Sequence, residues 1–159
     1  MSKQLSPATE QLSKAGLDFT VHEYVHDPAA ASYGDEAVAG LGVDASRIFK
    51  TLVAKLDHGE LVVAVVPVAH SLRLKALAAA ADTKKATMAE VAAAERSSGY
   101  VAGGISPFGQ RKRLRTFLDE SARDAQTIFV SAGRRGVEVE VAPHAFVEAL
   151  AAQWAPLAS

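Results

Sequence analysis

Residues 48–66, Ile-Phe-Lys-Thr-Leu-Val-Ala-Lys-Leu-Asp-His-Gly-Glu-Leu-Val-Val-Ala-Val-Val, contain the clearest β-pattern in the chain. Aliphatic and β-branched residues dominate Ile48–Leu56 and Glu60–Val66, and Asp57-His58-Gly59 between them is typical of a hairpin turn. The second strand is apolar on both faces, so we expect it to lie centrally and buried in a sheet. Because a hairpin joins antiparallel strands, the pattern predicts a mixed sheet rather than a wholly parallel one.

The rest of the chain mixes predicted helices and strands. Ser6 and Pro7 are typical of a helix start, and this helix is expected to end at Gly16. Further helices are predicted at residues 33–41, at 72–81 after a capping Ser71, from Thr87-x-x-Glu90 to about Arg96, and from Pro143 to near Trp154. Further strands are predicted at residues 19–24, 114–118, 127–131 and 137–141, with a tight loop at 132–136. No repeat or long linker divides the chain, so residues 1–159 are predicted to form one domain.

The composition restricts the class of protein. Of the 159 residues, 49% are hydrophobic and none is cysteine. The chain therefore has no disulfide, no thiolate nucleophile and no cysteine-based metal site. It has no long apolar run, and its first twelve residues are too polar for a signal peptide, so we expect no membrane association and a cytoplasmic location. The net charge is −1, yet residues 111–135 carry seven basic and three acidic side chains, which indicates local contact with an anion.

A glycine-rich stretch, Gly103-Gly-Ile-Ser-Pro-Phe-Gly-Gln110, predicts a rigid and irregular loop. Glycine permits positive φ and close approach of the main chain to a ligand, and Pro107 pushes Ser106 toward an extended conformation. Such a loop either presents main-chain N–H groups to an oxygen-rich ligand or simply connects two elements. The glycine spacing fits neither a dinucleotide-binding fingerprint nor a Walker A loop.

A few polar residues have both a functional and a structural interpretation. Lys50 stands in an apolar strand and either points to solvent or supplies a positive charge inside a pocket. Ser131 ends a strand, where it either lines a cleft or satisfies a turn. Arg134 and Arg135 are either solvated or bind phosphate. The run Arg111, Lys112, Arg113 and Arg115 is either a solvated strand edge or a contact for a nucleic-acid backbone.

Two common types of site are not indicated. His22 and His26 are four residues apart, but they fall on a predicted strand and have no third ligand placed by the sequence, so we expect no metal and no cofactor. The chain has no nucleophile elbow and no evident Ser-His-Asp set. The sequence therefore offers positioning and electrostatic stabilisation rather than an activated nucleophile.

Four segments in order resemble the YbaK/EbsC family of free-standing aminoacyl-tRNA deacylases, which are related to the editing domain of bacterial prolyl-tRNA synthetases. The segments are His-Glu-Tyr-Val-His-Asp-Pro (22–28) with Tyr-Gly-Asp-Glu-Ala (33–37), Phe-Lys-Thr-Leu-Val (49–53), Gly-Tyr-Val-Ala-Gly-Gly-Ile-Ser-Pro-Phe-Gly-Gln (99–110) and Val-Ser-Ala-Gly-Arg-Arg-Gly (130–136). The first is similar to the cysteinyl-tRNA(Pro) deacylase branch of the family. Together they span almost the whole chain.

The resemblance implies a fold and an activity. The fold is a single α/β domain with a curved, mixed and largely antiparallel sheet flanked by helices. The activity is hydrolysis in trans of the ester that joins a wrong amino acid to tRNA(Pro), with cysteine as the expected amino acid. The thiol of that cysteine attacks its own ester carbonyl and releases the tRNA. The acceptor end of tRNA(Pro) is the implied partner, with prolyl-tRNA synthetase in a ternary complex by family analogy.

The resemblance also implies roles for individual residues. Those matched to the catalytic positions are Lys50, Gly103 and Ser131. Those matched to substrate-binding positions are Tyr24, Thr51, Gly104, Ile105, Ser106, Pro107, Arg134, Arg135 and Glu138. Some relatives have aspartate where this chain has Glu138, and Ala132 replaces a glycine of the family's loop, which stiffens that segment. Two alternatives remain: an alanyl-tRNA(Pro) deacylase, and a non-catalytic module that binds tRNA ends or nucleotides.

Overall fold

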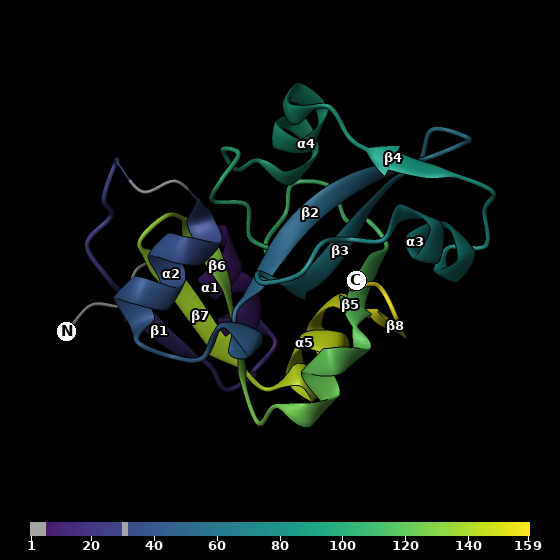
Figure 1. The fold of residues 1–159 in the computed structure, drawn as a ribbon. Coiled ribbons are helices and arrows are strands. Elements are labelled where there is room, and N and C mark those ends of the chain that lie inside the picture. Colours follow the sequence, from purple (N-terminus) through teal and green to yellow (C-terminus); the bar gives the residue numbers. More distant parts are fainter. Residues whose placement is uncertain (1–5, 30–31) are drawn as a thin grey trace.

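The hairpin predicted at residues 48–66 lies at the centre of the fold (Figure 1). In the computed structural model, which describes residues 6–29 and 32–159, strands β2 (Phe49–Leu56) and β3 (Leu61–Pro67) pair antiparallel from Phe49↔Pro67 to Lys55↔Leu61. Gly59 in the turn has φ +99°, a conformation that favours glycine. Val62 to Val66 of β3 are all buried, which confirms the central position that its apolar faces predict. Met1–Leu5, the start of the polar N-terminal segment, lie outside the described residues.

The predicted α/β class with mixed, mostly antiparallel pairing is confirmed, but the described residues form two sheets instead of one curved sheet, and the hairpin belongs to the larger. The larger has the strand order β4-β2-β3-β5-β8, in which the pairs β3–β5 and β5–β8 are parallel and the others antiparallel. The smaller has the order β1-β7-β6 and is wholly antiparallel. The remaining strands are β1 (Thr20–Glu23), β4 (Ala86–Met88), β5 (Thr116–Asp119), β6 (Ile128–Arg134), β7 (Val137–Val141) and β8 (Gln153–Ala155).

One apolar core joins the two sheets. Phe49, Val63 and Val65 of the larger sheet pack with Val130 and Val139 of the smaller. A bridge between Ile48 and Phe129 ties the sheets together at their edges. Burial of this shared apolar surface stabilises the two sheets as one unit, at roughly 25 cal/mol per Å² of apolar area.

The helices cover the outer faces of the sheets. Their bounds are α1 (Pro7–Lys14), α2 (Tyr33–Leu41), α3 (Leu74–Ala80), α4 (Val91–Ser98) and α5 (Pro143–Leu150), with 3-10 turns at Ala45–Arg47 and Glu120–Asp124. Figure 1 shows α2 beside the smaller sheet, α3 beside β3, and α4 near the far end of β2. No helix among the described residues has both the length and the hydropathy needed to cross a bilayer.

Three predicted helix boundaries were wrong, each because β-type pairing with another segment takes the residues involved. The third helix begins at Leu74, since the segment from Ser71 pairs with the C-terminus, where Ser159 N–H donates to Ser71 O at 3.0 Å. The fourth begins at Val91, because Thr87 lies in β4 opposite Lys55 and cannot cap it. The last helix ends at Leu150, and Trp154 lies instead in β8.

The predicted loop at 132–136 is also shorter than expected. Residues up to Arg134 continue β6, with a register shift between Ser131 and Arg134. Only Arg135 and Gly136 form the turn into β7. The shift sets the direction of this hairpin tip, which packs against the glycine-rich loop.

Candidate active site

A pocket of about 430 Å³ lies where β2 has a free edge. Strand β4 pairs only with Ala54–Leu56, so among the described residues no strand pairs with the first half of β2 on that side. The N-terminus of α2, the start of α4 and the glycine-rich loop surround this open edge. The topology of the larger sheet therefore creates the pocket, because the edge strand β4 is short and leaves the first half of β2 uncovered.

The structure brings five of the sequence-predicted residues to this pocket. They are Lys50, Thr51, Gly103, Ile105 and Ser131. The other seven lie outside its lining: Tyr24, Gly104, Ser106, Pro107, Arg134, Arg135 and Glu138. Gly104, Ser106 and Pro107 are buried inside the loop itself, whereas Tyr24, Arg134 and Arg135 line a shallower hollow on the other side of the β6–β7 hairpin.

Lys50 supplies a partly desolvated positive charge. Its side chain is half-buried, and this loss of water lowers the pKa of its ammonium group below 10.5. No carboxylate contributes to that shift, and in the described residues Lys50 forms no ion pair. An ammonium that is partly dehydrated and unpaired is available to bind an anionic group of a ligand.

Thr51, the next residue, has an unusual hydroxyl. Its Oγ1 is buried and, among the described residues, is the only buried side-chain oxygen or nitrogen without a hydrogen-bond partner. Leaving such a group unpaired costs about 1–3 kcal/mol. A ligand in the pocket that hydrogen-bonds to Thr51 would recover that cost, so the pair Lys50-Thr51 has the features of a binding site rather than of an ordinary strand.

The glycine-rich loop is fixed against β6 by contacts that tolerate no side chain. A Cβ at Gly104 would lie 2.9 Å from Arg134 Cα, and one at Gly133 would lie 2.8 Å from the ring of Tyr100. The Ser131 hydroxyl donates to Gly104 O at 3.2 Å and accepts from Gly133 N–H at 3.1 Å. Ser131 therefore joins the loop to the strand, and both functions of its hydroxyl are already occupied.

The loop is also braced from within. The Tyr100 hydroxyl donates to Phe108 O at 2.7 Å, and Phe108 N–H donates to Ser106 Oγ at 3.2 Å. In contrast, the main-chain N–H groups of Gly103 and Ile105 donate no hydrogen bond within the described chain. A rigid loop with free N–H groups at a pocket can stabilise negative charge on an oxygen.

Sequence reasoning missed Tyr33 as a pocket residue. Tyr33 is the first residue of α2 after the N-cap Ser32, whose hydroxyl accepts from Asp35 N–H at 3.1 Å. Both Tyr33 and the exposed Asp35 line the pocket, whereas Glu36 is buried beneath α2 and accepts from Asp27 N–H at 2.6 Å. The cap indicates where this helix begins, but no local pattern shows which way its first ring points.

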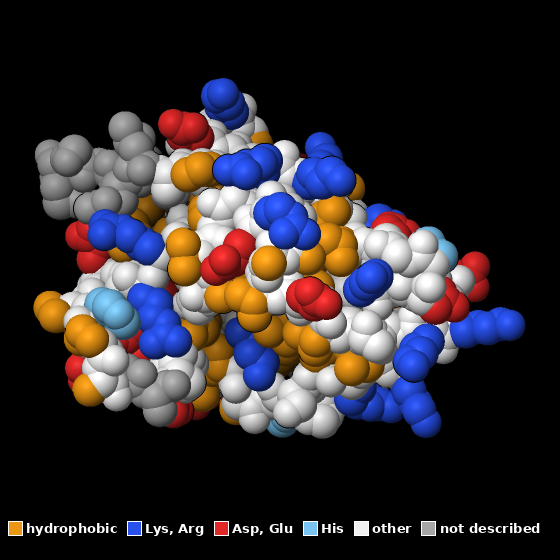
Figure 2. Space-filling view, turned by 90° about the horizontal axis from the view of Figure 1, so that it is seen from above, with side chains coloured by type: hydrophobic (Ala, Val, Ile, Leu, Met, Phe, Trp, Pro, Cys, Tyr) orange, Lys and Arg blue, Asp and Glu red, His pale blue; other side chains and the backbone are white. Residues whose placement is uncertain are grey.

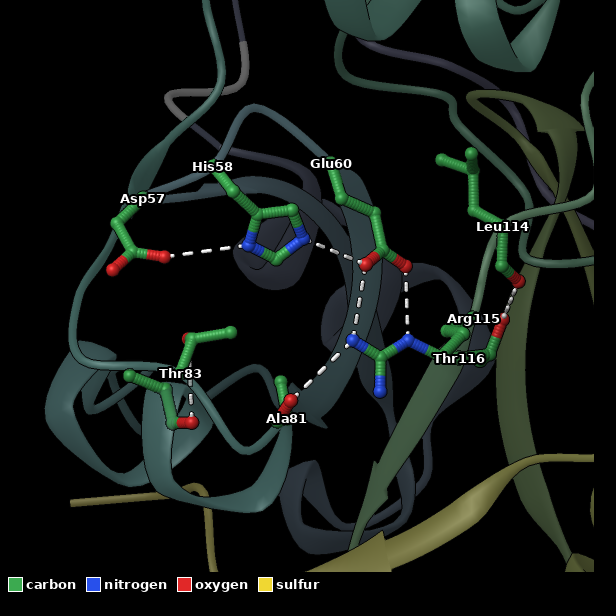
Figure 3. A network of polar contacts seen from close by, with 9 residues as sticks. Asp57, His58, Glu60, Ala81, Thr83, Leu114, Arg115 and Thr116 are labelled. Atoms are coloured by element: carbon green, nitrogen blue, oxygen red, sulfur yellow. Dashed lines mark hydrogen bonds and ion pairs between the residues drawn. The ribbon is translucent and has the colours of Figure 1, made fainter.

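The basic segment after the loop divides into two parts. Arg115 is held by Glu60, with Nε at 2.9 Å and a terminal nitrogen at 3.1 Å, in a network that continues to His58 and Asp57 (Figure 3). This pairing raises the pKa of Arg115 and directs its guanidinium toward the β2–β3 turn. Residues 111–113 are exposed beside a second hollow of about 390 Å³. Of the four predicted basic residues, only Arg111, Lys112 and Arg113 therefore form an exposed basic edge that has no ion pair within the described residues.

The face above α4 and β4 is rich in positive charge (Figure 2). Lys and Arg side chains are spread over it, with fewer Asp and Glu, around a hollow lined by hydrophobic side chains. Met88 and Val91, which line the pocket, are 47% and 62% exposed. The pocket thus has an apolar rim on a largely basic surface, a combination suited to an anionic ligand that also carries flat or apolar groups.

The comparison with known families agrees with this geometry. The sequence profile described as "Aminoacyl-tRNA editing domain" matches residues 27–149. The chain belongs to this family. It is also 42% identical over 123 residues to a protein of Enterococcus faecalis provisionally named Cys-tRNA(Pro)/Cys-tRNA(Cys) deacylase EbsC, with 77% of this chain and 75% of the relative covered. The resemblance to the YbaK/EbsC family is therefore confirmed.

Solved structures show the same editing-domain fold. A crystal structure of a hypothetical protein superposes with a TM-score of 0.86 at 21% identity and covers 97% of this chain and 100% of its own. A second crystal structure, provisionally described as a trans-editing enzyme for prolyl-tRNA synthetase, gives 0.83 at 22% identity and covers 98% and 99%. At these identities the likeness concerns the fold alone.

Proposed function

We propose that this editing-domain protein is a deacylase that removes cysteine from mischarged tRNA(Pro) in trans. One observation carries the proposal most directly. An unpaired cation, an unpaired buried hydroxyl and free main-chain N–H groups surround one pocket, and no activated nucleophile lines it within the described residues. Membership of the editing family and the similarity to the E. faecalis protein support an aminoacyl ester as the substrate.

The absence of a nucleophile with an adjacent base favours a reaction in which the substrate provides its own. The cysteine sulfur attacks the carbonyl carbon of its own ester, and a C–S bond forms. The C–O bond to the terminal ribose then breaks, and the proton of the thiol passes to that oxygen. The products are a cyclic thiolactone, which water can open, and tRNA with a free hydroxyl. The protein contributes orientation and charge stabilisation.

Each pocket residue has a role in this scheme. Lys50 binds the phosphate or ribose of the terminal adenosine, and Thr51 hydrogen-bonds to another polar group of the aminoacyl end. The N–H groups of Gly103 and Ile105 stabilise the oxyanion that forms at the carbonyl. Ser131 holds the loop that carries them. A further set supports the loop or contacts the RNA backbone from outside the pocket: Tyr24, Gly104, Ser106, Pro107, Arg134 and Arg135.

The test is a deacylation assay with tRNA(Pro) charged with cysteine, serine or alanine. We expect cysteine to be released much faster than serine, because a hydroxyl is a poorer internal nucleophile than a thiol. Lys50→Ala should lower kcat/KM by about 10²-fold, the usual size of a lost electrostatic contact. Lys55→Ala, on the exposed part of the same strand, is the matched control and should change it little. Faster release of alanine would support an alanyl-tRNA(Pro) deacylase, and tight tRNA binding without turnover would support a binding module.

Recognition of the tRNA body is a separate part of the proposal. The pocket is large enough only for the aminoacyl end, so we infer that prolyl-tRNA synthetase selects tRNA(Pro) in a ternary complex in the cytoplasm. Adding the synthetase should then raise the rate for Cys-tRNA(Pro) over that for Cys-tRNA(Cys). Equal rates for the two tRNAs in its presence and absence would contradict this part alone.

A further inference from the structure

Glu138 is a carboxylate with no exposure to solvent, next to residues that line the pocket. It lies in β7 opposite Ser131 of β6, and opposite His22 of β1 on its other side. Residues directly opposite one another in antiparallel strands point to the same face, so Glu138 and Ser131 share the face that the pocket rests on. A buried carboxylate requires hydrogen-bond donors in place of water, so the donors around Glu138 indicate what it does.

Two tyrosine hydroxyls provide those donors. Tyr33 donates to Oε1 at 2.5 Å, and Tyr24 donates to Oε2 at 3.4 Å. No cation pairs with Glu138 in the described residues. Burial raises its pKa to about 7, although the hydrogen bonds from Tyr33 and Tyr24 act in the opposite direction. Each carboxylate oxygen of Glu138 thus has a tyrosine donor, and the residue has no contact with solvent.

Glu140, on the same face of the same strand, is a natural comparison. It bonds to His22 at 2.8 Å, to Arg47 at 3.2 Å and to the Thr127 hydroxyl at 2.5 Å. Partial burial acts to raise the pKa of Glu140, but the hydrogen bonds and charges of these partners outweigh it, and the pKa is lowered. The two carboxylates differ in their partners. Glu140 contacts an arginine, a histidine and a hydroxyl, whereas Glu138 contacts two tyrosine hydroxyls, of which that of Tyr33 belongs to the wall of the pocket.

Tyr33 connects Glu138 to the pocket. Its ring is half-buried and lines the pocket, while its hydroxyl reaches Glu138 and lies 3.5 Å from Phe49 O, one residue before Lys50. The short bond to Glu138 thus fixes the first turn of α2 against both β7 and the start of β2. Without an acceptor at position 138, this phenol ring would have no charged partner to hold its rotamer.

We propose that Glu138 is a positioning residue: it holds the Tyr33 ring as the wall of the pocket that receives the aminoacyl group, and it does not bind the substrate. The inference rests on the proposed deacylase function. In its ionised form Glu138 accepts from both tyrosines. When it is protonated, its own proton occupies one oxygen, and the pair of bonds cannot be kept intact. The other titratable groups that face it are Glu36 on α2 and His22 on β1, which is bonded to Glu140.

The test compares Glu138→Gln, Tyr33→Phe and their double variant, with Glu140→Gln as the control, in Cys-tRNA(Pro) deacylation between pH 5.5 and 8.5. The substrate thiol titrates equally in all of them, so the ratio of wild-type to variant kcat/KM isolates the protein. For Glu138→Gln, this ratio should rise about tenfold as the pH increases, with a midpoint near pH 7. A change of about tenfold is the size expected for the loss of a hydrogen bond to a charged group. Tyr33→Phe should cause a similar loss at high pH, and the double variant should be no worse than either single one.

Two outcomes would overturn the proposal: a pH-independent ratio for Glu138→Gln, or additive effects of the two substitutions. A readout without substrate separates this inference from the function. The carboxyl ¹³C signal of Glu138 should titrate near pH 7, and the ring signals of Tyr33 should follow it in the wild type and in Glu140→Gln. If the wild type deacylates nothing but this coupling is present, the proposed function fails and the positioning role stands. If Tyr33 does not follow Glu138, the positioning role fails even in an active enzyme.

Discussion

Replacing Glu138 with glutamine is expected to change how the stability of the protein depends on pH. The folded protein holds the proton of Glu138 with a pKa of about 7, whereas the ordinary value is 4.5. The folded state therefore binds more protons than the unfolded state between these values. Stability from this group is fully present below pH 4.5 and is lost as the pH rises through about 7.

The size of the effect follows from the same two values. Their difference, 7 − 4.5 = 2.5, corresponds to about 3 kcal/mol at 1.36 kcal/mol per pH unit. Glutamine has nearly the same shape but cannot ionise. The free energy of unfolding of Glu138→Gln minus that of the wild type should therefore increase by about 3 kcal/mol between pH 4.5 and pH 8.

Urea unfolding of both proteins across this pH range, followed by circular dichroism, measures that difference. Glu140→Gln is a control with the opposite sign, because the pKa of Glu140 is lowered in the folded state. Its carboxylate stabilises the protein above pH 4.5, and that contribution disappears as the pH falls through its folded pKa. A difference for Glu138→Gln that stays flat, or that falls as the pH rises, would refute the buried, cation-free environment described for Glu138.

Three further predictions concern single contacts. Thr51→Val should leave the free energy of unfolding unchanged or higher, because the hydroxyl has no partner, yet it should raise KM in the deacylation assay. Gly104→Ala should destabilise the protein by about 1–3 kcal/mol in urea and lower kcat, because the new Cβ would lie 2.9 Å from Arg134 Cα and move the loop. Asp119→Ala should cost about 2 kcal/mol in the same unfolding measurement, because Asp119 accepts from Leu157 and Ala158 N–H at 2.8 Å each.

The parts of the fold that local pattern specifies were predictable. Alternation and turn residues placed the β2–β3 hairpin within a residue of its observed bounds, and Ser6-Pro7 placed α1. The errors fall where distant segments compete for the same residues. Thr87 has the pattern of a helix cap, but pairing with Lys55 in β4 removes it from that role. The residues next to Thr87 in the sequence do not show that the edge of β2 near Lys55 is open for pairing.

The site shows the same division. The family resemblance indicated Lys50, Thr51 and the glycine-rich loop, and the fold places them around one pocket. The alternating sequence of residues 137–141 predicted a strand, in which Glu138 and Glu140 share one face. It could not indicate that α2 covers one carboxylate completely and leaves the other beside Arg47, because that depends on packing between elements more than 90 residues apart in the chain.

The chemistry of the pocket also bears on how cysteine is distinguished from alanine. Alanine is smaller than cysteine, so a pocket that accepts cysteine cannot exclude alanine by size. The thiol that alanine lacks is worth only about 1–3 kcal/mol of binding. The Ser131 hydroxyl is occupied by Gly104 and Gly133, and among the described residues Thr51 has no base as a hydrogen-bond partner. A site that orients the ester without attacking it releases only those amino acids that carry their own nucleophile. Under the proposed mechanism, selectivity for cysteine would come from the reactivity of the thiol rather than from the fit of the side chain.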